Sequence, residues 1–132
     1  TDRLYWMKRI KYELEFIFRA SPAIVYKFLT APSCLIRWFC DGVDINGDIY
    51  SFEWQGFGED AFMIDDIEEE RIRFQWMESD YPDEYFEFRM YKSPITEETI
   101  LEITDFCDES ELKDQKELWS NQIAKLRKET GG

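Results

Sequence analysis

The residue type that most often acts as a general base is absent from this sequence. The chain contains no histidine, which removes the commonest general base, the usual serine and cysteine triads and most zinc sites. Its three cysteines, Cys34, Cys40 and Cys107, lack CxxC spacing. We interpret them as buried structural thiols in a reducing cytoplasm, because an odd count does not suit a disulfide framework. We therefore predict a protein that is not an enzyme and has no metal or other cofactor.

One acidic stretch begins like a calcium-binding loop. Residues 44–48 read Asp-Ile-Asn-Gly-Asp, but Gly47 falls at the fourth position of the loop instead of the sixth. Gln55 also stands where a calcium loop has its bidentate glutamate. An Asn46-Gly47 hairpin turn explains the stretch without a metal.

Aromatic side chains are the feature that could bind a ligand. They recur at every second position along three predicted strands and so share one face of the sheet, with polar residues on the other. The rings either fill a core or line a cavity that a curved sheet leaves beside a helix. Gln115 and Gln122 either meet a ligand or trapped water there, or lie in water at the helix edge. The candidate lining residues are Trp38, Tyr50, Phe52, Trp54, Phe74, Trp76, Phe86, Phe88, Gln115, Trp119, Gln122 and Ile123.

A long C-terminal helix is needed to cover these rings. Residues 108–129 contain no Gly or Pro and are rich in good helix formers. Asp108 and Glu111 have the spacing of a capping box, and Gly131 predicts the end of the helix. The predicted apolar stripe consists of Leu112, Leu118, Trp119, Ile123 and Leu126.

The preceding chain predicts one strand, two short helices and six further strands. Residues 11–19 alternate between apolar and polar, as a half-buried strand does. Ser21 and Pro22 predict the start of a helix, Pro32 interrupts it, and residues 34–39 form a second short helix. Residues 55–58 are predicted to form a loop. The six later strands are expected over residues 43–45, 49–54, 61–67, 71–77, 84–91 and 99–106.

Length and charge limit the classes of protein and partner. A chain of 132 residues predicts one domain over residues 1–132. Residues 1–10 are an apolar extension that either lengthens the first strand or packs on a partner, which allows a homodimer. The net charge of −13 argues against nucleic acid and against an anionic membrane surface. We expect no membrane insertion and no signal peptide, hence a cytoplasmic protein. The acidic surface either aids solubility or docks a basic partner.

Several segments resemble one family of proteins. Residues 25–39, VYKFLTAPSCLIRWF, resemble the Hsp90-ATPase-activator-homologue branch of the START-like, Bet v 1-like (SRPBCC) superfamily. The segments at 39–54, 104–106 and 118–123 resemble a compact START-like group of Bacteroidetes proteins. The residues that match the activator pattern are Tyr26, Leu29, Thr30, Pro32 and Trp38.

The resemblance implies an α+β helix-grip fold. Such a fold has a curved antiparallel sheet of about six or seven strands, with two short helices after the first strand. A long C-terminal helix packs on its concave face. Family members typically enclose a cavity between the sheet and this helix, and many bind hydrophobic small molecules.

We weigh three functions. The first is non-catalytic binding of a small apolar, amphipathic or lipid-like ligand between the sheet and the C-terminal helix. The alternative is a co-chaperone-like regulatory domain with a filled core and a protein partner. The third is an enzyme, which would need two polar side chains converging inside a pocket. A cavity favours the first function, and a filled core favours the second.

Overall fold

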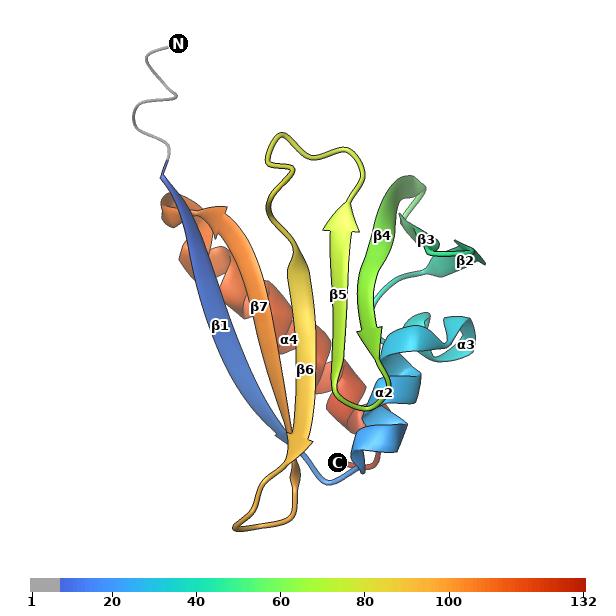
Figure 1. The fold of residues 1–132 in the computed structure, drawn as a ribbon, viewed down its shortest axis with the longest axis vertical. Coiled ribbons are helices and arrows are strands. Elements are labelled where there is room, and N and C mark those ends of the chain that lie inside the picture. The colour runs from blue at the N-terminus through green and yellow to red at the C-terminus, as the bar shows by residue number, and fades with distance from the viewer. Residues whose placement is uncertain (1–7) are drawn as a thin grey trace.

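This computed structural model describes residues 8–132. They fold into a seven-stranded antiparallel sheet with helices against one face (Figure 1). The strand order is β1-β7-β6-β5-β4-β3-β2, so the first strand pairs with the last. One strand, two helices, six strands and a long helix follow one another, as predicted. The elements are β1 Arg9–Phe18, α2 Pro22–Thr30, α3 Pro32–Leu35, β2 Gly42–Asn46, β3 Ile49–Trp54, β4 Phe57–Ile67, β5 Arg71–Trp76, β6 Phe86–Lys92, β7 Thr99–Asp108, η1 Glu109–Glu111 and α4 Leu112–Glu129.

The predicted apolar face of the sheet is confirmed. Phe74 pairs with Phe86, and Ile72 pairs with Phe88, so rings on adjacent strands meet on the same face. These four side chains are almost completely buried. Figure 1 shows α4 crossing behind the sheet, with α2 and α3 beside one end of it.

The opposite face is not exposed to solvent throughout. Glu87 is buried there, and Arg73 donates two hydrogen bonds to its carboxylate, at 2.9 and 2.7 Å. The Arg73 guanidinium also lies 3.9 Å from the centre of the Tyr85 ring. A buried carboxylate is tolerated here because it has a charged hydrogen-bond partner.

The two short helices begin at prolines. Ser21 caps α2 by accepting a hydrogen bond from the Ile24 amide at 3.3 Å, as its sequence position predicts. The second helix was predicted over residues 34–39, but α3 begins at Pro32, because proline suits the first turn of a helix. Residues 36–39 form turns instead of helix.

Two turns differ from the predicted ones. Asn46 pairs with Ile49, so the β2–β3 turn consists of Gly47 and Asp48 instead of Asn46 and Gly47. Strand β4 begins at Phe57, and the loop predicted over residues 55–58 is only a two-residue turn. Gln55 adopts a φ of 47° in that turn. Its amide donates to the Asp41 carboxylate at 2.7 Å, a contact that residue spacing alone does not reveal.

The long helix begins later than its sequence suggests. A 3-10 turn, η1, precedes α4, and the predicted capping box is absent. Asp108 instead accepts a hydrogen bond from Arg9 at 3.1 Å, because these residues face one another in the β1–β7 pair. The predicted C-terminal stop is confirmed: Gly131 has a φ of 101°, and the Gly132 amide donates to the Arg127 carbonyl at 2.8 Å.

The prediction that residues 1–10 lengthen the first strand or pack on a partner falls mostly outside the described residues. The first strand extends the predicted one by two residues, to Arg9, and the expectations for residues 1–7 stay untested. No helix within residues 8–132 is long and apolar enough to cross a membrane.

The packing of α4 predicts a large difference between two leucines of the same helix. Leu126 is 0% exposed and Leu118 is 52% exposed. Leu126→Ala should lower the free energy of unfolding by about 3 kcal/mol, because it leaves a cavity, and Leu118→Ala should lower it by less than about 1 kcal/mol. Urea denaturation of both variants checks this, and equal losses would contradict the described orientation of the helix.

Candidate ligand pocket

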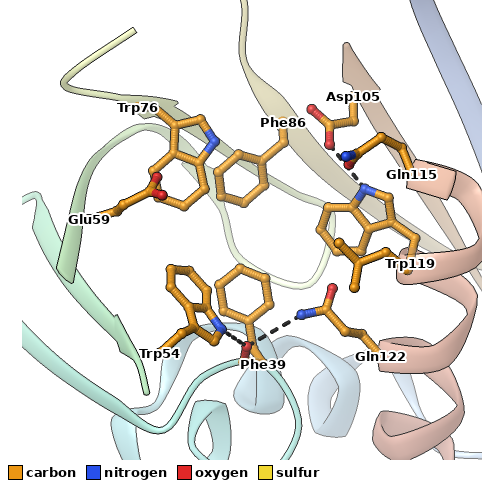
Figure 2. Close-up of a pocket in the computed structure, with 10 residues that line it drawn as sticks. Phe39, Trp54, Glu59, Trp76, Phe86, Asp105, Gln115, Trp119 and Gln122 are labelled. Atoms are coloured by element: carbon orange, nitrogen blue, oxygen red, sulfur yellow. Dashed lines mark hydrogen bonds between the residues drawn. The ribbon is translucent and has the colours of Figure 1, made fainter. Parts of the chain in front are cut away.

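A pocket of about 420 Å³ lies between the N-terminal half of α4 and one end of the sheet (Figure 2). Strands β3 and β5 end there, and β4 and β6 begin there. Near the other end, fully buried side chains such as Leu29 of α2 and Leu126 of α4 fill the core. The pocket is lined by Phe39, Trp54, Glu59, Trp76, Phe86, Asp105, Gln115, Leu118, Trp119 and Gln122.

Five aromatic rings form most of the pocket wall. Phe39 is central, with its ring centroid 5.4 Å from that of Trp54 and 6.3 Å from that of Trp119. On the sheet, the Trp76 and Phe86 centroids are 5.0 Å apart. These separations are typical of packed aromatic pairs, so the rings hold one another in place around the space.

The main-chain carbonyl of Phe39 fixes two lining side chains. It accepts hydrogen bonds from Trp54 Nε1 at 2.6 Å and from Gln122 Nε2 at 3.4 Å. These bonds join the segment after α3 to the end of β3 and to the middle of α4. Figure 2 shows all three groups at the same side of the pocket. Gln122 thus has the buried partner that its position on the helix seam requires.

Asp105 is the most chemically distinctive lining residue. It lies on the inner face of β7 with Leu101 and Ile103, and is half-buried. Its Oδ2 accepts hydrogen bonds from Trp119 Nε1 at 3.0 Å and from the Tyr12 hydroxyl at 3.4 Å. Its Oδ1 accepts from the Phe106 amide at 2.8 Å.

Burial of Asp105 raises its pKa above the ordinary value for an aspartate, and the hydrogen bonds from Phe106, Trp119 and Tyr12 act in the opposite direction. Burial has the larger effect because the carboxylate loses water on several sides. Among residues 8–132, Asp105 forms no ion pair. Its charge is therefore supported by hydrogen-bond donors without a neutralising cation.

The two carboxylates of the pocket lie apart from each other. Figure 2 shows Glu59 beside Trp76, whereas Asp105 lies beside Gln115 and Trp119 on another side of the space. Within the described chain, no group of three or more His, Cys, Asp or Glu could hold a metal ion. The three cysteines are free and buried, and burial raises the pKa of Cys40 to about 11, which keeps this thiol protonated at neutral pH.

The structure divides the twelve candidate residues into two groups. Six of them line the pocket: Trp54, Trp76, Phe86, Gln115, Trp119 and Gln122. The other six are buried around it without lining it: Trp38, Tyr50, Phe52, Phe74, Phe88 and Ile123. Whether either group binds a ligand stays a prediction.

Four lining residues were not among the candidates. Phe39 lies in a turn, which alternation cannot orient, and Leu118 was assigned to the helix stripe without a role in the cavity. Strand alternation gives a usable signal for the other two. Glu59 is two positions before the buried Ala61, and Asp105 is two positions after Ile103.

Comparison with protein families identifies the class of protein. A model of the START-like superfamily domain matches residues 6–132. The chain therefore belongs to the START-like superfamily, which confirms the resemblance found in its sequence and the helix-grip fold. Domains of this fold are commonly ligand-binding or regulatory.

Solved structures agree with this assignment. The BfR322 protein of Bacteroides fragilis is 34% identical, with a TM-score of 0.69; the match covers 96% of this chain and 94% of that one. The Aha1 dimer of Colwellia psychrerythraea is 16% identical with a TM-score of 0.77, covering 92% and 96% of the two chains. MLL2253 of Mesorhizobium loti is 15% identical with a TM-score of 0.73, covering 90% and 95%. The last two show a shared fold alone. No curated protein matches the chain.

The hydrogen bond from Trp119 makes the titration of Asp105 testable. Replacing Trp119 with Phe removes a donor that favours the charged carboxylate, so the pKa of Asp105 should rise further. Carbon-detected NMR titration of the Asp105 carboxyl group measures this shift. Trp76→Phe is the matched control, because Trp76 also lines the pocket but donates no hydrogen bond to Asp105. An unchanged Asp105 pKa in Trp119→Phe would contradict the described geometry.

Proposed function

We propose that this protein binds a small hydrophobic or amphipathic molecule, without catalysis, in the pocket between the sheet and α4. The observation that supports this most directly is an aromatic-lined space of about 420 Å³ beside a core that is otherwise closely filled. That volume falls within the range of small-molecule sites, roughly 300–1,000 Å³.

The aromatic lining would supply most of the binding energy. A ligand that buries about 200 Å² of apolar surface gains roughly 5 kcal/mol from that burial. Lost translational and rotational freedom offsets several kcal/mol of this gain. Specific polar contacts must therefore supplement apolar burial for tight binding, and Gln115, Gln122 and Asp105 are placed to make them.

A second candidate is a regulatory domain that binds a protein or a second copy of itself. Phe62 of β4 is 38% exposed and pairs with Gln75, which places it on the face of the sheet away from α4. Ile64, which is 48% exposed, lies two residues further on at a β-bulge of the same strand. One structural neighbour is an Aha1 dimer. Exposed apolar side chains on one strand suit such a contact.

The organisation and location of the protein also stay proposals. A single domain over residues 1–132 is consistent with the extent of the family match. A cytoplasmic location is inferred from the unpaired cysteines, which are free and buried.

Native mass spectrometry of gently purified protein tests the binding function. We expect a reproducible non-covalent adduct that is lost when the protein is denatured. Gln122→Trp should abolish the adduct, because a larger ring would occupy part of the pocket. Asn121→Trp is the matched control, since it replaces the adjacent amide side chain on the exposed side of α4 and should retain the adduct.

Two outcomes would count against this function. Equal adducts in both variants would place the bound molecule outside the pocket. A clean mass for the wild-type protein, together with a dimer in the same spectrum, would favour the protein-interaction candidate.

A further inference from the structure

We propose that the ligand of this pocket is an organic amine, protonated at neutral pH, whose ammonium group pairs with Asp105 and whose apolar body lies among the aromatic rings. This inference rests on the proposed binding function and specifies the chemical class of the ligand. It is drawn from the hydrogen-bonding capacity of Asp105, the charges around it and the composition of the pocket wall.

Asp105 has room for one further hydrogen-bond donor. A carboxylate offers about four acceptor positions. The Phe106 amide, the Trp119 indole and the Tyr12 hydroxyl occupy three of them, and the Tyr12 contact is long at 3.4 Å. Because Asp105 also lines the pocket, we infer that the remaining position faces it. An ammonium N–H would complete this set with a charge-assisted bond.

Within residues 8–132, no basic side chain forms an ion pair with Asp105. Arg9 lines an adjoining groove together with Asp105, but its guanidinium is already bound to Glu84 and Asp108. Arg37 and Lys125 line a neighbouring groove that shares Phe39 and Trp54 with the pocket, but they do not line the pocket itself. A half-buried carboxylate without a counter-ion is costly. A cationic ligand would remove that cost, whereas an anionic ligand would increase it.

The aromatic wall is also suited to a cation. Three tryptophans, Trp54, Trp76 and Trp119, line the space together with Phe39 and Phe86. The faces of aromatic rings attract cations, and tryptophan does so most strongly. Glu59 adds a second carboxylate at the edge of the pocket, and the net charge of −13 raises the local concentration of cations around the whole protein.

An inorganic cation fits this environment poorly. A divalent metal requires several ligands close together. Residues 8–132 contain no group of three or more His, Cys, Asp or Glu that could hold one. The two carboxylates of the pocket lie on different sides of it (Figure 2). A ligand with one cationic end and an apolar body uses both the isolated carboxylate and the rings.

Three probes of nearly equal shape and different charge test the inference on the wild-type protein. Phenethylamine is cationic at neutral pH, phenethyl alcohol is neutral and hydrocinnamate is anionic. Isothermal titration calorimetry should show the amine binding roughly tenfold more tightly than the alcohol, with the anion weakest. Equal affinity for amine and alcohol, or tighter binding of the anion, would overturn the inference.

Two matched variants locate the charge effect. Asp105→Asn should reduce the ratio of amine affinity to alcohol affinity from about ten to near one, because the amide keeps an acceptor but not the charge. Glu102→Gln changes the net charge by the same amount on the same strand. It lies on the opposite face, where its carboxylate accepts from Tyr91, and should leave the ratio unchanged. An equal loss of the ratio in both variants would show that the overall charge, not Asp105, selects the amine.

The two proposals fail in different ways. If the alcohol binds as well as the amine, the pocket binds ligands without selecting amines, and only this inference is overturned. If none of the probes binds, this inference is also overturned. The adduct measurement on gently purified protein, which assumes no ligand class, then decides the proposed binding function separately.

Discussion

A single helix is too narrow to cover the inner face of this sheet, and the rest of the structure follows from that mismatch. Seven strands about 4.8 Å apart span roughly 29 Å, whereas a helix with its side chains is about 10–12 Å wide. Helices α2 and α3 cover the sheet toward one end, and Val25 and Leu29 of α2 are fully buried. Toward the other end only the first half of α4 is present, and large aromatic rings extend across the remaining width. The pocket is the space that those rings do not fill.

The same arrangement explains why a carboxylate lies among aromatic rings. Asp105 is held by donors from β1, β7 and α4, namely the Tyr12 hydroxyl, the Phe106 amide and the Trp119 indole. These bonds support a charge that burial alone would disfavour, as the raised pKa of Asp105 indicates. The polar group thus connects the first and last strands to the helix, and it also gives the apolar pocket a chemical preference. Structure and proposed selectivity depend on the same three contacts.

Strand alternation predicted the strands and the aromatic face, because both follow from local residue order. The helix-grip arrangement came from the order of the elements and the resemblance to START-like proteins. Alternation could not distinguish Phe52, which is buried, from Trp54, which lines the pocket, since that depends on where α4 and α3 end above the sheet. Asp105 was within reach of the same reasoning, as it shares its face with Leu101 and Ile103. The start of α4 was mispredicted because Asp108, the expected capping residue, forms an ion pair with Arg9 across β1 and β7 instead. No local sequence pattern indicates such a contact.

The most direct test of this account follows the indole N–H signals in a ¹H–¹⁵N NMR titration with phenethylamine. The account predicts saturable shifts for Trp54 and Trp119, whose indoles bond Phe39 and Asp105 at the pocket. Trp38, whose indole donates to the Phe28 carbonyl at 2.8 Å within the filled core, should stay unchanged and serve as an internal control. Unchanged pocket signals, or a Trp38 shift as large as theirs, would contradict the claim that a cationic ligand binds among these rings.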